Sequence, residues 1–221
     1  MQTGLEALDL HSGGTELEYV ITDGLITATA GVGGAAVFTL ALTQASAGTA
    51  PSYVYTQTAV LDHLDGASPL SVLDLPFVMT VTDGDGDTAA ASLTINVTDD
   101  VPTAVAQGAV SVVEGAAVPI GSSNGGASLL AGDTTGADGA LVHQITYIDD
   151  AGTTQTATLA GGTTGALDAQ YGTLTVLSDG TWTFAPHANA AHTNGAPLDA
   201  SFSYTLIDTD GQVMIGRLHV R

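Results

Sequence analysis

Short segments in which apolar and polar residues alternate occur along most of the chain. A period of two places successive side chains on opposite faces of a β-strand, and Thr, Val and Ile, which favour strands, are frequent in these segments. Clusters of Gly, Asp and Pro separate them. No stretch has a convincing helical face, so the pattern predicts an all-β protein built from β-sandwiches. The clearest segments are residues 25–30, 36–42, 53–60, 92–97, 172–177 and 181–184.

An internal repeat appears when the two halves of the chain are compared. The segment FVMTVTDGDGDTAAASLTI (77–95) aligns without gaps on FSYTLIDTDGQVMIGRLHV (202–220), and Asp83 then matches Asp208. Each copy has the form of the last hairpin of a β-sandwich. The repeat therefore predicts that the chain holds two related domains.

The boundary between the domains falls where the first copy of the repeat ends. The acidic segment DDVP follows it, and Pro102 favours an extended backbone there. A chain of 221 residues is long enough for two ordinary domains. We predict one domain at 1–98, a linker at 99–102 and a second domain at 103–221.

The charge of the chain is strongly one-sided. There are 23 acidic residues against two basic ones, Arg217 and Arg221, and the formal net charge is −21. Self-repulsion of this size opposes compaction unless cations screen it, so nucleic acid and anionic membranes are poor partners and divalent cations are good ones. We find no apolar run long enough for membrane insertion, and the absence of cysteine leaves packing or metal as sources of stability.

The most concentrated carboxylates lie in the sequence VTDGDGDT, where Asp83, Asp85 and Asp87 alternate with glycine. Calcium takes six to eight oxygen ligands, and a loop bent at glycine can arrange carboxylates around it. The alternative is a plain hairpin turn, for which one Asp-Gly pair would suffice. Three aspartates with no nearby cation would repel one another, so we favour a calcium site. It is not an EF-hand, because no helices flank it.

A second set of carboxylates lies in and beyond the linker. Asp99 and Asp100 are either a solvated acidic linker or ligands shared by the two domains. The intervening strand, ten residues at about 3.3 Å each, sets them roughly 30 Å from the DGDGD turn, so one ion cannot serve both. In the sequence IDTDGQ, Gln212 replaces the third aspartate of the first copy, which weakens that site or leaves room for the linker aspartates. The other candidate calcium ligands are Asp62, Asp65, Asp133, Asp138, Asp208 and Asp210.

Catalytic chemistry has little support in the sequence. There is no cysteine, no lysine and no GxSxG motif. His187 and His192 are five residues apart, which does not suit a zinc site on a helix, and we expect them in a loop. Trp182 belongs to an alternating strand and is expected to pack in the core or on a sheet face and not to form a sugar platform. The protein is therefore predicted not to be an enzyme.

Several motifs together resemble a known group of secreted proteins. The segment TVTDGDGDTAAASLTINVTDDVPTA is similar to the repeat ends of large RTX-type adhesins secreted by type 1 systems. SVVEGAAV, LLAGDTTGADG, YGTLTVLSDGTWTFAP and SFSYTLIDTDG resemble the VCBS or bacterial Ig-like, cadherin-like repeats of such proteins. LDHLD and VTDDVP also resemble the calcium motifs at the foot and linker of a cadherin repeat, although His63 stands where cadherins place Arg.

The resemblance implies two tandem Ig-like or cadherin-like β-sandwich domains joined by a short calcium-binding linker. Calcium at the linker would use Asp62 or Asp65 with Asp99 and Asp100, joined by Asp138, Asp208 and Asp210, while the DGDGD turn would face a preceding repeat. The expected function is a non-catalytic extender of a bacterial surface adhesin, secreted and monomeric, which supports cell adhesion and biofilm formation. Its partners would be neighbouring repeats. The alternative is a module that recognises a glycan, a peptide or a cell surface.

Overall fold

The computed structural model describes residues 2–44, 50–63, 72–116, 118–137, 139–192, 195–209, 211 and 213–221. Two compact units make up the chain, unit 1 (Met1–Asp100) and unit 2 (Val101–Arg221). The predicted all-β class is confirmed. In the described ranges the helical structure consists of two short 3-10 turns, η1 (Gly4–Ala7) and η2 (Ala160–Gly162).

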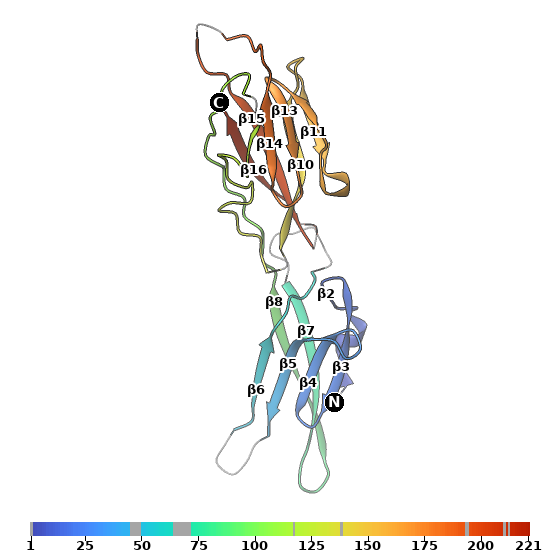
Figure 1. The fold of residues 1–221 in the computed structure, drawn as a ribbon. Coiled ribbons are helices and arrows are strands. Elements are labelled where there is room, and N and C mark those ends of the chain that lie inside the picture. Colours follow the sequence, from blue (N-terminus) through green and yellow to red (C-terminus); the bar gives the residue numbers. More distant parts are fainter. Residues whose placement is uncertain are drawn as a thin grey trace. The chain divides into compact units, whose positions relative to one another are not determined.

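Unit 1 consists of two antiparallel sheets. One has the strand order β1-β7-β8 and the other the order β2-β3-β4-β5-β6. Figure 1 shows β7 and β8 as a long hairpin whose tip projects past the ends of β3 and β4. The strands of unit 1 are β1 (Gln2–Thr3), β2 (His11–Ser12), β3 (Thr15–Thr22), β4 (Leu25–Ala30), β5 (Ala36–Thr43), β6 (Ser52–Gln57), β7 (Val72–Thr82) and β8 (Thr88–Thr98).

The core of unit 1 lies between its two sheets. Phe38 on β5 and Phe77 on β7 are both fully buried, and their rings meet edge to face at 6.4 Å between centroids. Such aromatic pairs stabilise a core beyond the area that they bury. The other buried apolar residues around them are Leu5, Leu10, Leu17, Ile26, Ala28, Val37, Leu40, Leu61 and Leu75.

Unit 2 is also built from two antiparallel sheets, with the strand orders β11-β10-β15-β16 and β12-β13-β14-β9. The segment before β9 adds to the first sheet, because Val110 bridges Val220 in parallel. The strands of unit 2 are β9 (Ile120–Gly121), β10 (Ala140–Ile148), β11 (Thr154–Thr158), β12 (Leu167–Ala169), β13 (Gly172–Val176), β14 (Trp182–Pro186), β15 (Ala200–Asp208) and β16 (Val213–Val220).

Trp182 is at the centre of the core of unit 2. It is fully buried, and its indole N–H donates a 2.7 Å hydrogen bond to the carbonyl of Ala127, so its one polar group is satisfied. Phe184 on β14 and Phe202 on β15 join the two sheets, with ring centroids 5.7 Å apart. The expectation that Trp182 is a packing residue is therefore confirmed, and of the two places expected it lies in the core.

The internal repeat is present as two hairpins with the same register. In unit 1, Phe77 pairs with Leu93 and Thr82 with Thr88, the last pair before the turn. The matching pairs in unit 2 are Phe202 with Leu218 and Ile207 with Val213. The prediction that each copy forms the last hairpin of its sandwich is confirmed.

Candidate metal centre

The turn between β7 and β8 brings the three predicted aspartates together. Asp83, Asp85 and Asp87 are all exposed, and one carboxylate oxygen from each lies within 4.8 Å of the others. The Oδ1 of Asp83 accepts hydrogen bonds from the backbone N–H groups of Asp85 (3.3 Å), Gly86 (3.0 Å) and Asp87 (2.8 Å). Gly86 has φ +102°, which glycine adopts readily. The local sequence thus shapes the turn by itself.

The contacts of the turn also affect the pKa of Asp83. A hydrogen bond with the Asp85 side chain, together with the backbone N–H groups of the turn, holds the pKa of Asp83 below its usual value against the opposing effect of desolvation. Three carboxyl groups this close repel one another where they carry charge, and a divalent cation would relieve that repulsion.

The oxygen count of this turn fits part of a calcium coordination shell. The three carboxylates of Asp83, Asp85 and Asp87 carry six oxygens, two each, and the Oδ1 of Asp83 is already the acceptor of three N–H groups. Five oxygens remain, fewer than the six to eight that calcium takes. Water or a further ligand would have to complete the shell.

Asp62 occupies a different setting within unit 1. It is buried, and its two oxygens accept hydrogen bonds of 2.7 Å each from the backbone N–H groups of Gly13 and Gly14. Its own N–H donates to the carbonyl of His11. The side chain therefore fixes the turn between β2 and β3. This contact accounts for the burial of Asp62 without a metal, and its role as a ligand stays a prediction.

His63 connects the same segment to the end of β8. Its Nδ1 lies 3.0 Å from the carbonyl oxygen of Leu61 and 3.5 Å from the Oδ1 of Asp99, and its Nε2 lies 3.3 Å from the carbonyl oxygen of Val97. The side chains of His63 and Asp99 are both buried. His63 thus holds the first linker aspartate against its own unit, while Asp100 is exposed.

Asp133 of unit 2 has a structural partner for each of its oxygens. The Oδ1 accepts a 2.7 Å hydrogen bond from the N–H of Val105, and the Oδ2 lies 3.1 Å from the hydroxyl of Tyr204. That hydroxyl is also 2.8 Å from the carbonyl oxygen of Leu129. Burial of the Tyr204 ring, with a contribution from Asp133, raises the pKa of Tyr204 to about 12. Asp133 thus ties two loops to β15.

Asp208 matches Asp83 in the repeat but not in its surroundings. It is 7% exposed, whereas Asp83 is exposed. Asp208 continues the alternation of buried residues along β15, whereas the last three residues of β7 are exposed. β15 lies between β10 and β16, and Asp208 pairs with Ala140, whereas the end of β7 pairs with β8 alone. Asp65, Asp138 and Asp210 lie outside the described residues, so the ligand set expected at the linker stays a prediction.

A further cluster of possible ligands was not expected from the sequence. His187 lies between two exposed carboxylates, with its Nδ1 3.7 Å from the Oδ1 of Asp150 and its Nε2 3.6 Å from the Oδ1 of Asp168. Sheet pairing brings them together, because Asp149 bridges Ala169 and Gly172 pairs with Pro186. The three positions are far apart in the sequence, and no spacing signal could have found them.

Two facing antiparallel sheets closed around a buried tryptophan define unit 2 as an immunoglobulin-like β-sandwich. The chain belongs to the bacterial Ig domain family, whose model matches residues 99–221. No curated protein matches the chain significantly. Domains of this family are typically non-catalytic and commonly occur in surface or secreted proteins. Among the described residues, no helix is long and apolar enough to cross a membrane.

Proposed function

We propose that the chain is a pair of calcium-stabilised extender domains from a secreted bacterial surface adhesin. Their task would be mechanical: they would hold a distal binding region away from the cell and so support adhesion and biofilm formation. The neighbouring repeats of the same polypeptide would be their partners. The observation that carries the proposal is the exposed group of Asp83, Asp85 and Asp87, whose carboxylate oxygens lie within 4.8 Å of one another.

The charge of the chain supports a cation at this turn. No lysine occurs in the sequence, and the two arginines are Arg217 and Arg221, both in unit 2. Unit 1 therefore has no lysine or arginine to neutralise its carboxylates. Millimolar calcium outside a cell would fill weak carboxylate sites, and binding to the folded state alone would stabilise it by mass action.

The repeated hairpin supports the extender role. Both units end in a hairpin of the same register that closes on an acidic turn, which is what a tandem array of one ancestral repeat would produce. In this proposal, calcium at Asp99 and Asp100 would restrict motion between neighbouring repeats. The acidic linker would repel itself where calcium is scarce, which suits secretion in an unfolded state.

Thermal unfolding of the 221-residue chain in calcium and in EGTA tests the proposal. We expect calcium to raise the unfolding midpoint. At a concentration one hundred times the dissociation constant, binding at one site adds about 2.7 kcal/mol to the free energy of unfolding. The triple variant Asp83→Asn, Asp85→Asn, Asp87→Asn should lose most of this gain.

A charge-matched control removes three acids that belong to no such group among the described residues. Glu16→Gln, Glu18→Gln and Asp23→Asn change exposed residues on β3 and its following turn. This variant should keep the full response to calcium, because it changes the net charge equally but leaves the DGDGD turn intact. Identical unfolding curves for the wild type in calcium and in EGTA would refute the proposal.

A further inference from the structure

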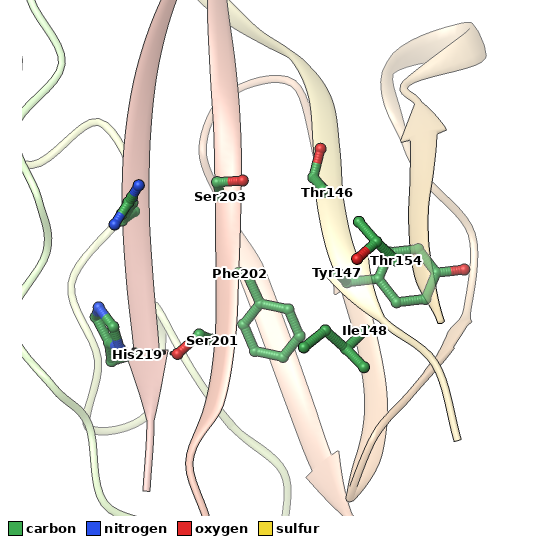
Figure 2. A pocket seen from close by; sticks show the side chains of 9 residues that line it. Thr146, Tyr147, Ile148, Thr154, Ser201, Phe202, Ser203 and His219 are labelled. Carbon is green, nitrogen blue, oxygen red and sulfur yellow. Dashed lines mark hydrogen bonds between the residues drawn. The ribbon is translucent and has the colours of Figure 1, made fainter. Parts of the chain in front are cut away.

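The outer face of the β11-β10-β15-β16 sheet carries a shallow trough of about 240 Å³. Its floor is formed by the small side chains of Ser201 and Ser203 on β15. Figure 2 shows these serines between His219 on β16 and the residues Thr146 and Ile148 on β10. Larger side chains on the two neighbouring strands thus form the walls.

The strand register aligns the polar groups of the trough. Ser203 pairs with Thr146 on one side and with Arg217 on the other, so a guanidinium and two hydroxyls form one row across three strands. Residues that pair directly in this way point to the same face of a sheet. The Thr146 hydroxyl also lies 3.4 Å from that of Thr156, a contact too long to be a strong hydrogen bond, so the row still offers donors to one ligand at the same time.

Arg217 is unusual in so acidic a chain, because no carboxylate of the described residues forms an ion pair with it. Arg217 is exposed, and the described residues provide no hydrogen bond or ion pair to its guanidinium. The other arginine, Arg221, contacts the Oδ2 of Asp199 at 3.4 Å. Like Arg217, the hydroxyl of Ser203 has no hydrogen bond within the described part of the chain.

Two carboxylates next to residues of the trough, Asp199 and Asp149, already have partners. Asp199 accepts a hydrogen bond from Ser201 (3.1 Å) in addition to its contact with Arg221. Asp149, in the turn after β10, accepts hydrogen bonds from the backbone N–H of Thr153 and from the side chain of Gln155. These contacts leave Arg217 as the group in the trough that can attract an anion.

We propose that this trough binds a carboxylated sugar residue, a hexuronate within a glycan. Arg217 would hold the carboxylate, since a guanidinium matches its geometry, and the hydroxyls of Ser203 and Thr146 would bind the sugar hydroxyls. Exposed Ile148 would contact the apolar face of the ring. A peptide fits less well. Peptides often bind a sheet through backbone hydrogen bonds, but in the trough the strands β10, β15 and β16 hydrogen-bond to their neighbouring strands and present only side chains to a ligand.

NMR titration of the isotope-labelled 221-residue chain with methyl glucuronide tests this assignment. We expect saturable shifts of the amides of Ser201, Ser203 and Thr146, with a dissociation constant of about 1 mM for a single sugar. The methyl ester of the same sugar lacks the charge and should bind about tenfold more weakly. Propionate, which has the carboxylate without the sugar hydroxyls, should also bind more weakly than the glucuronide.

Two arginine variants provide matched controls. Arg217→Gln should weaken binding by about tenfold or more, because it removes the donor to the carboxylate. Arg221→Gln makes the same charge change one residue beyond the end of β16; it frees Asp199 from its ion pair but leaves Arg217 in place, and should weaken binding less than Arg217→Gln does. Absence of saturable shifts, equal losses in both variants, or propionate binding as tightly as the glucuronide would overturn the proposal. Binding that survives Arg217→Gln and disappears in EGTA would instead indicate a calcium bridge and would also overturn it.

Discussion

The contacts of Asp133 predict that this residue acts as a structural clamp, a side chain that links Val105 to Tyr204 through hydrogen bonds, and not as a calcium ligand. Its carboxylate accepts hydrogen bonds from the N–H of Val105 and from Tyr204, whose side chain is 1% exposed. Replacing Asp133 with alanine should therefore destabilise unit 2 whether calcium is present or absent. The residue was a candidate ligand on its sequence alone, so the experiment separates two roles.

The two hydrogen bonds of Asp133 set the size of the expected loss in the free energy of unfolding. A hydrogen bond to a charged group contributes about 1.5–3 kcal/mol, but the Val105 contact is exposed and water can replace it. We therefore expect Asp133→Ala to cost about 2 kcal/mol. In a domain of this size, about 1 kcal/mol lowers the unfolding midpoint by about 4 °C, so the transition of unit 2 should fall by about 8 °C.

Differential scanning calorimetry of the whole chain, in calcium and in EGTA, gives the measurement. Tyr204→Phe removes the hydroxyl alone, and the double variant with Asp133→Ala should show a coupling of about 1 kcal/mol. Tyr147→Phe is the matched control, because the described residues give its hydroxyl no hydrogen bond. No change in the midpoint would refute the clamp, and a loss confined to calcium would show that Asp133 binds the metal.

Three further predictions follow from single contacts. A Cβ at Gly216 would lie 2.2 Å from the Cζ of Tyr204, so Gly216→Ala should cost about 1–3 kcal/mol by chemical denaturation, whereas Gly108→Ala, with open space around it, should not. Hydrogen bonds, first that from the N–H of Thr153, lower the pKa of Asp149 in the folded protein. The ionised Asp149 therefore stabilises the fold above its unfolded pKa, and this stabilisation is lost as the pH falls through its folded pKa. The difference in unfolding midpoint between the wild type and Asp149→Asn should shrink from about pH 6 to about pH 2, and a constant difference would contradict this. A zinc titration followed by NMR should shift the ring signals of His187 before those of the other histidines if its two aspartate neighbours hold metal, and equal shifts at all histidines would contradict such a site.

The local features of the protein were determined by the sequence alone. Period-two alternation located β4, β13 and β14, because strand side chains alternate between core and solvent whatever the neighbouring strands are. The repeat predicted two hairpins, and their registers agree pair for pair. The grouping of Asp83, Asp85 and Asp87 was also predictable, since a tight turn brings together residues that are close in the chain.

The roles of the remaining polar residues were decided by tertiary structure. Asp62 binds backbone groups at Gly13 and Gly14, nearly fifty residues away, and no local pattern encodes that contact. His187 meets its two aspartates only because sheet pairing brings three distant segments to one place. Arg217 lines the trough only because β16 lies beside the serines of β15. The sequence specified which side chains could bind a cation or an anion, and the packing of the strands decided which of them are buried, already paired or exposed for binding.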